Sequence, residues 1–126
     1  MIHNAFISSS FHDKEFVFEL FNTLQRANIT SYIDFIYNET IQHWEDTFLD
    51  RIKTSKVFVS IISENYINSE CAMVEWGAAF ALGKPIISIV IGNVSLPFNI
   101  GISHQLDFTD SKDASRDLVD IINRIK

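Results

Sequence analysis

Two segments of the sequence, KVFVSIIS (56–63) and PIISIVI (85–91), are nearly continuous runs of apolar residues that are rich in valine and isoleucine. Such runs are typical of strands buried on both faces, as in a parallel sheet that helices cover from both sides. The segment between them, CAMVEWGAAFAL (71–82), predicts a helix that Gly83 ends and Pro85 follows. This strand–helix–strand order indicates an α/β fold.

The rest of the chain continues the alternation. Apolar residues at helical spacing predict helices within 10–27, 38–55 and 111–126, and short apolar runs predict strands at 4–8, 31–35 and 106–109. Ser10 and Asp13 form a Ser-x-x-Asp variant of the capping box. Residues 92–105 contain glycine and proline and predict a loop. We therefore predict one doubly wound domain over residues 1–126, and we expect it to be a module of a longer protein.

Composition excludes several classes of function. The formal net charge is −6, which is unfavourable for binding nucleic acid. No apolar stretch approaches the length of a membrane span, and the first residues do not resemble a signal peptide. The one cysteine, Cys71, excludes an internal disulfide and fits a reducing compartment. We therefore expect a cytoplasmic protein.

Glu75 is the one charged residue in the apolar segment 71–82. A carboxylate among buried neighbours is costly unless it is paired, hydrogen-bonded or protonated. Its neighbours three and four residues away (Cys71, Ala72, Ala78 and Ala79) are all small, which leaves room for a ligand. A lone glutamate that reaches solvent or a nearby cation is the alternative, and the pattern alone leaves both open.

Ligands of open parallel sheets bind beyond the carboxyl ends of the strands, where the strand order reverses. With the order 2-1-3-4-5, this point lies between the first and third strands. Mostly polar residues follow the first and third strands, and the second strand ends nearby. The residues expected at this edge are Ser8, Ser9, Ser10 and Phe11 after the first strand, Asp34 and Phe35 at the end of the second, and Ser63, Glu64 and Asn65 after the third.

Other proteins with this kind of fold match less well. A phospho-acceptor site requires acidic residues directly after the first strand and Asp at the end of the third, where this chain has serines and Ser63-Glu64. A dinucleotide-binding loop requires glycines after the first strand, and none occur there. The four histidines show no metal-ligand spacing, so we predict no metal site. No Gly-x-Ser-x-Gly pattern surrounds Ser8 to Ser10, and capping by Ser10 explains that serine better than a nucleophile does.

Three boxes resemble those of Toll/interleukin-1 receptor (TIR) domains. They are NAFISSSFHD (4–13), YID (32–34) and SIISENYINSECAMVE (60–75). The third is similar to a family signature, Ser-x-Asn-Tyr-x-x-Ser followed six residues later by Glu, which falls here on Ser63, Asn65, Tyr66, Ser69 and Glu75. The stretch 75–91 is closer to bacterial TIR proteins than to animal receptors. The resemblance covers residues 4 to about 109.

The resemblance implies a flavodoxin-like three-layer sandwich with a five-stranded parallel sheet of order 2-1-3-4-5. It also implies one of two functions: a self-associating signalling module, or cleavage of NAD⁺ by the glutamate that Glu75 matches. Two features depart from the family pattern. Many enzymatic members have Trp where this chain has Cys71, and the loop after the second strand, FIYNETIQ (35–42), lacks the usual Pro/Gly pair.

We predict from the resemblance a bacterial-type NAD⁺ glycohydrolase of antiphage defence, with NAD⁺ as substrate and no cofactor. Its expected catalytic residue is Glu75, and the expected substrate-binding residues are Ser9, Ser10, Phe11, Asp34, Phe35, Trp44 and Cys71. Expected partners are further copies of the chain in a head-to-tail assembly, and a fused or separate sensor domain. A catalytically silent TIR module and a nucleoside (deoxyribosyl)transferase-like enzyme are the alternatives.

Overall fold

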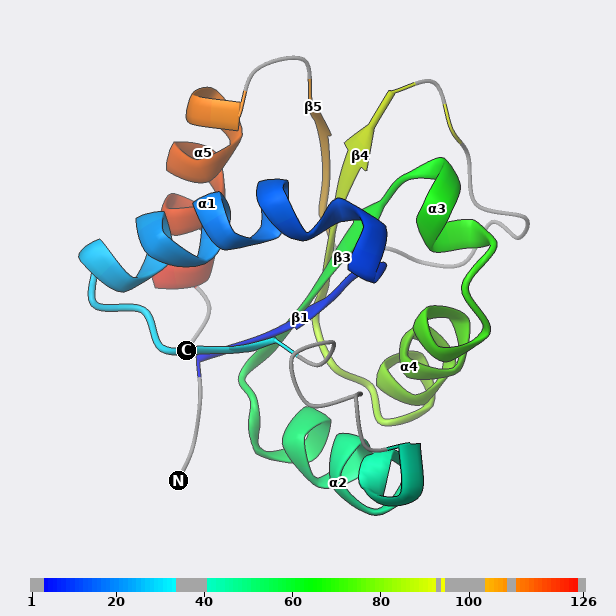
Figure 1. Ribbon diagram of the computed structural model, residues 1–126. Coiled ribbons are helices and arrows are strands. Elements are labelled where there is room, and N and C mark those ends of the chain that lie inside the picture. Colours follow the sequence, from blue (N-terminus) through cyan, green and yellow to red (C-terminus); the bar gives the residue numbers. More distant parts are fainter. Residues whose placement is uncertain (1–3, 34–40, 93, 95–103, 109–110, 125–126) are drawn as a thin grey trace.

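The computed structural model describes the backbone of residues 4–33, 41–92, 94, 104–108 and 111–124, and the side chains of 4–33, 48–92, 94 and 116–124. Its strands are β1 (Ala5–Ser8), β2 (Ser31–Ile33), β3 (Val57–Ile62), β4 (Ile86–Ile91) and β5 (His104–Phe108). They pair in parallel in the order β2-β1-β3-β4-β5 (Figure 1). The predicted α/β fold, with the order 2-1-3-4 for its first four strands, is confirmed.

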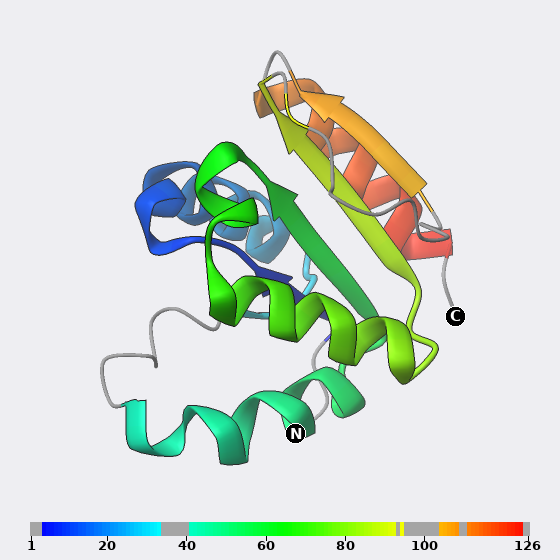
Figure 2. The same cartoon turned by 90° about the vertical axis from the view of Figure 1, so that its right-hand side faces the viewer.

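Helices cover both faces of this sheet. They are the 3₁₀ turn η1 (Phe11–Asp13) and the α-helices α1 (Lys14–Arg26), α2 (Ile41–Thr54), α3 (Glu64–Ile67), α4 (Glu70–Ala81) and α5 (Ser111–Arg124). Helices α1 and α5 lie together on one face, and α2 and α4 lie together on the other (Figures 1 and 2). This is the three-layer arrangement that buried parallel strands require.

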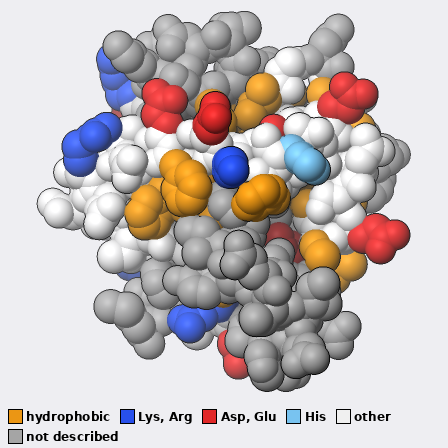
Figure 3. All heavy atoms as spheres, viewed as in Figure 1, with side chains coloured by type: hydrophobic (Ala, Val, Ile, Leu, Met, Phe, Trp, Pro, Cys, Tyr) orange, Lys and Arg blue, Asp and Glu red, His pale blue; other side chains and the backbone are white. Residues whose placement is uncertain are grey.

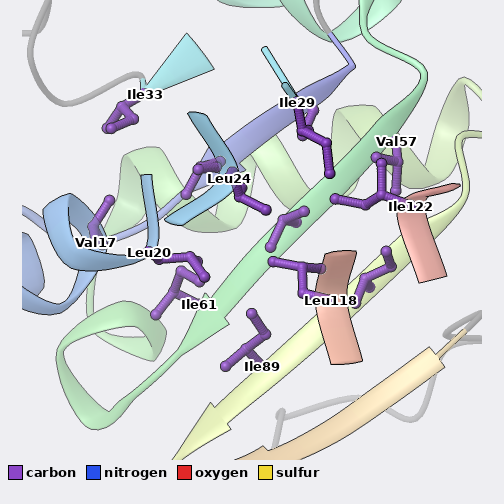
Figure 4. Packing of buried hydrophobic residues seen from close by; sticks show 14 residues of the cluster. Val17, Leu20, Leu24, Ile29, Ile33, Val57, Ile61, Ile89, Leu118 and Ile122 are labelled. Carbon is purple, nitrogen blue, oxygen red and sulfur yellow. The ribbon is translucent and has the colours of Figure 1, made fainter. Parts of the chain in front are cut away.

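The core beneath α1 and α5 is aliphatic. Helix α1 contributes Val17, Leu20 and Leu24, and α5 contributes Leu118 and Ile122. The sheet contributes Ala5, Ile7, Ile33, Val57, Val59, Ile61, Ile87 and Ile89 to the same cluster. Figure 4 shows labelled members of this cluster packed between the helices and the sheet. Every second residue of β1, β3 and β4 faces this way, as the period of a strand demands.

The opposite face of the sheet packs aromatic side chains against α2 and α4. Phe6 of β1 stacks on Phe58 of β3 and on Tyr32 of β2, with 5.5 Å between ring centroids in each pair. Trp76 of α4 and Ile52 of α2 belong to the same cluster and are fully buried. The apolar side of α4 is thereby fixed against the sheet, and this sets the direction in which Glu75 points.

The bounds of several elements differ from those predicted. The first predicted helix is divided into η1 and α1, and the short helix α3 was not predicted. The last residues predicted for the second strand, and most of the predicted loop at 92–105, lie outside the described residues. Helix α4 ends where predicted, since Gly83 follows it with a φ of +70°, a conformation that glycine adopts without strain. Across the described helices, none is long and apolar enough to cross a membrane.

Candidate active site

Two serine caps set the course of the chain beyond β3. The Ser63 hydroxyl accepts a hydrogen bond from the Tyr66 backbone N–H at 3.1 Å and so begins α3. The Ser69 hydroxyl accepts one from the Ala72 N–H at 3.2 Å and begins α4. Side-chain oxygens at these positions satisfy N–H groups that a helix leaves unpaired in its first turn. The two caps bring the first turns of α4 to the carboxyl edge of the sheet.

Glu75 lies on the inner side of α4 and is only 1% exposed. The Ser8 hydroxyl, at the end of β1, donates a hydrogen bond to Glu75 Oε1 over 2.7 Å. Ser8 is itself fully buried, and its oxygen lies 2.9 Å from the Tyr66 hydroxyl. The cost of burying the carboxylate is therefore offset at least in part by a hydroxyl from the sheet.

Tyr66 is also fully buried, with its hydroxyl 3.4 Å from the Ala72 carbonyl oxygen. Burial raises the pKa of Tyr66 well above its ordinary value, and the nearby charge of Glu75 adds to the rise. Both effects disfavour a phenolate. Tyr66 therefore serves this site as a neutral phenol, able to donate one hydrogen bond.

A pocket of about 630 Å³ opens beside Glu75. The loop after β1, the segment between α3 and α4, and the first turns of α4 form its walls. The residues that line it are Ser9, Ser10, Phe11, His12, Asn65, Asn68, Ser69, Cys71, Ala72 and Glu75. A volume of this size is within the range of small-molecule sites. The pocket lies at the carboxyl ends of β1 and β3. The order of the strands reverses between these two, and α/β sheets bind ligands at such a point.

The rim of the pocket carries an aromatic ring and several hydroxyl and amide groups. Phe11 is 52% exposed, and the Lys14 ammonium lies over its ring at 4.8 Å from the centroid. The Ser9 hydroxyl oxygen is buried and has no hydrogen-bond partner among the described residues. A buried hydroxyl without a partner is uncommon, and at the wall of a pocket it is suited to bind a ligand.

Asp13 joins two loops at this edge. Its Oδ2 accepts a short hydrogen bond from the Ser63 hydroxyl, and its Oδ1 accepts one from Asn65 Nδ2 at 3.2 Å. Ser10 caps η1, as predicted, by accepting from the His12 N–H at 3.2 Å. The capping box predicted for Ser10 and Asp13 is therefore wrong in its second half, because the Asp13 carboxylate makes tertiary contacts instead.

The pocket brings together five of the predicted site residues: Ser9, Ser10, Phe11, Cys71 and Glu75. Asp34 and Phe35 lie outside the described residues, and the Trp44 side chain does as well. The small residues expected beside Glu75 are represented at the pocket by Cys71 and Ala72. No group of three potential metal ligands occurs within the described residues.

Several residues at this site were not predicted from the sequence as site residues. Ser8 was expected only at the edge of the sheet, Asn65 at that edge and in a family signature, and Tyr66 only as part of the signature. His12, Asn68 and Ser69 were not singled out as pocket residues. One signal was available for the hydrogen-bond partner of Glu75: Ser8 is a polar residue at the end of a buried apolar strand.

This fold is that of a TIR domain. The TIR domain family model matches residues 5–121, and the chain belongs to this family. The structure is similar to the TIR domain of a Toll-related receptor from Hydra magnipapillata, with a TM-score of 0.77 and 19% identity over 96% of this chain and 98% of that one. The comparison with curated proteins found no match.

Two enzymes that act on nucleosides or nucleotides have the same fold. The CMP N-glycosidase of Clostridium botulinum is 18% identical over 90% of this chain and 96% of that one, with a TM-score of 0.69. The 2-deoxyribosyltransferase of Bacillus psychrosaccharolyticus is 21% identical over 88% and 89%, with a TM-score of 0.70. At these identities the likeness concerns the fold alone.

Proposed function

We propose that this TIR domain is an NAD⁺ glycohydrolase that cleaves the bond between nicotinamide and ribose. The observation that carries the proposal is Glu75, a buried carboxylate at the wall of a pocket with the volume of a small-molecule site. Its hydrogen bond from Ser8 fixes one carboxylate oxygen within the site. A buried acid in a ligand-sized pocket is a candidate for chemistry.

A single acid is sufficient for this reaction. O-glycosidases use two carboxyl groups, one of which protonates the leaving oxygen. Nicotinamide leaves from a cationic pyridinium as a neutral base, so no proton has to be supplied to it. The positive charge that remains on the ribose is what needs stabilising, and a fixed carboxylate in a site that excludes water does this efficiently.

The reaction is balanced with water as the second reactant. The C–N bond breaks and its electron pair leaves with nicotinamide, while a water oxygen bonds to the anomeric carbon and loses a proton. The products are nicotinamide, ADP-ribose and H⁺. Attack by a group of the same ADP-ribose in place of water gives a cyclic product, and the proposal includes both outcomes.

Substrate binding is proposed for the remaining residues of the predicted site. The Ser9 and Ser10 hydroxyls face ribose or phosphate oxygens, and the Phe11 ring packs on a flat heterocycle. Cys71 lies at the helix start, where many enzymatic members of the family have a Trp. Asp34, Phe35 and Trp44 remain candidates for the part of the site outside the described side chains.

The direct test is incubation of the protein with NAD⁺ at high protein concentration, with the products separated by chromatography. We expect nicotinamide with ADP-ribose or its cyclic form. Glu75→Gln should retain the fold and lose nicotinamide release. Glu70→Gln is the matched control, because Glu70 is an exposed acid on the same helix and does not line the pocket. A folded Glu75→Gln protein with wild-type turnover would refute the role of Glu75.

A second candidate is cleavage or transfer at the N-glycosidic bond of another nucleoside or nucleotide. It is favoured by the shared fold of the CMP N-glycosidase and the 2-deoxyribosyltransferase. Parallel incubations with CMP and with a deoxynucleoside plus a free base distinguish these activities from NAD⁺ cleavage. Absence of turnover on every substrate, at all protein concentrations, would favour the catalytically silent module.

The biological setting belongs to the same proposal. A TIR domain that consumes NAD⁺ fits a cytoplasmic, bacterial antiphage role, in which a fused or partner sensor domain triggers head-to-tail assembly. On the coloured part of the face in Figure 3, hydrophobic side chains lie in small groups between polar and charged ones. Assembly through this face would therefore use a mixed surface, and such surfaces are typical of non-obligate contacts.

A further inference from the structure

Three buried groups from three different elements form one chain of hydrogen bonds at the proposed site. They are Tyr66 of α3, Ser8 of β1 and Glu75 of α4, and none is more than 1% exposed. The two contacts measure 2.9 Å from Tyr66 to Ser8 and 2.7 Å from Ser8 to Glu75. Both distances are normal for hydroxyl hydrogen bonds.

The number of hydrogens fixes the direction of this chain. A serine hydroxyl carries one hydrogen, and the Ser8 hydrogen is used in the bond to Glu75 Oε1. Tyr66 must then be the donor in the bond between the two hydroxyls. Its phenol stays protonated, since burial disfavours the phenolate. When Glu75 is ionised, the hydroxyl hydrogens of both Ser8 and Tyr66 are therefore used in hydrogen bonds.

The reverse direction is less well satisfied. A protonated Glu75 would donate to Ser8, Ser8 would donate to Tyr66, and Tyr66 would need an acceptor of its own. The Ala72 carbonyl oxygen is 3.4 Å from the phenol oxygen, beyond the usual range for an O–H···O bond. The Ser60 hydroxyl, which neighbours Ser8 in register on β3, lies close enough to Tyr66 to lower the pKa of the phenol against the larger effect of burial, as a donor to its oxygen does. It makes no contact within hydrogen-bond geometry among the described residues through which it would accept the phenol hydrogen. The arrangement therefore favours the carboxylate.

We propose that Ser8 and Tyr66 are positioning residues that hold Glu75 as an oriented carboxylate. The inference rests on the proposed function for its catalytic meaning, but the hydrogen-bond chain itself is testable without a substrate. Other titratable groups near Glu75 in the described part of the chain are His12 and Cys71, which line the same pocket. Glu64 and Glu70, in the first turns of α3 and α4, are exposed.

The test is to titrate the Glu75 carboxyl carbon by NMR in protein labelled with ¹³C-glutamate. The resonance is assigned as the one that Glu75→Gln removes, so the other titrating groups do not obscure it. Ser8→Ala should raise the midpoint by about one pH unit or more, because a hydrogen bond to the charged form is lost. Tyr66→Phe should raise it by a smaller amount, because Ser8 still donates.

Ser88→Ala is the matched control. Ser88 is a fully buried serine on β4, in register with Ser60 and on the same face of the sheet, and its hydroxyl has no partner among the described residues. Its variant should titrate like wild type. An unchanged Glu75 midpoint in Ser8→Ala overturns the proposal. If that variant does not fold, an unchanged midpoint in Tyr66→Phe overturns it instead.

Kinetics then separate this inference from the proposed function. If NAD⁺ is the substrate, Ser8→Ala should lower kcat at neutral pH by more than it raises KM, and the acid limb of the rate profile should move with the NMR midpoint. A protein that shows the NMR shifts but cleaves no NAD⁺ supports the positioning role and refutes the proposed reaction. A protein that cleaves NAD⁺ but shows no NMR shift in the variants supports the proposed reaction and refutes the positioning role of Ser8 and Tyr66.

Discussion

Asp13 accepts a hydrogen bond from Ser63, fifty residues further along the chain, and thereby joins the segment after β1 to the segment after β3. Asn65 adds a second hydrogen bond to the same carboxylate. Both segments contribute residues to the wall of the pocket beside Glu75. The shape of the pocket thus depends on a carboxylate that does not itself line it.

Removal of this carboxylate should loosen the walls of the pocket. We expect Asp13→Ala to lower the free energy of unfolding by about 1–3 kcal/mol, since two hydrogen bonds to a charged group are lost. Substrate affinity should fall as well. Urea denaturation measures the first effect, and Asp50→Ala, at an exposed position on α2, is the control. Equal free energies of unfolding for the two variants would show that the hydrogen bonds of Asp13 contribute little to stability.

Phe11 should affect substrate binding more than folding. The ring lines the pocket and is half exposed, so Phe11→Ala removes little buried surface. KM should rise several-fold with kcat nearly unchanged, as loss of uniform binding predicts. Phe18→Ala is the matched control, because Phe18 is 41% exposed on α1 and does not line the pocket. A lower melting temperature with unchanged kinetics would show instead that Phe11 serves packing.

The single cysteine offers a chemical probe of the pocket. Cys71 is exposed and lines the pocket, and the chain has no other thiol. A bulky maleimide attached there should block NAD⁺ cleavage almost completely, whereas Cys71→Ser should keep most of the activity and resist the reagent. Bound substrate or product should slow the labelling, as followed by mass spectrometry. Full activity of the labelled protein would place the substrate elsewhere.

Alkaline pH should destabilise the protein through Tyr66. The pKa of its hydroxyl is raised by burial in the folded state, so the unfolded chain loses this proton first as the pH rises. The free energy of unfolding should therefore fall as the pH rises above about 10, the ordinary tyrosine pKa. Urea titrations between pH 8 and 11 measure this slope. The slope should be smaller in Tyr66→Phe, and an equal slope in both proteins would contradict the assignment.

Assembly should control the activity. If sites are completed between subunits, specific activity should increase with protein concentration, and fusion to an oligomeric partner should raise it at low concentration. NAD⁺ cleavage per mole of protein, measured over a wide dilution series together with light scattering, tests this expectation. A constant specific activity in a sample that remains monomeric would argue against it.

Local pattern predicted the fold better than it predicted the site. The apolar runs that became β3 and β4 and the helix around Glu75 follow from the period of each element. Asp13 was misread because its spacing from Ser10 suits a local cap, whereas contacts with Ser63 and Asn65 determine its place. The partner of Glu75 could not be read from spacing, because Ser8 reaches it only once the sheet and α4 have packed.

The hydrogen bond between Ser8 and Glu75 spans 67 residues. A chain that emerges from the ribosome amino end first therefore has Ser8 exposed to solvent long before its acid partner has been synthesised. Domains generally fold as units during translation, and contacts this distant form late because the loop between them must first close. A nascent or prematurely terminated chain that ends before α4 thus carries no assembled site, because Glu75 and the helix that holds it are absent.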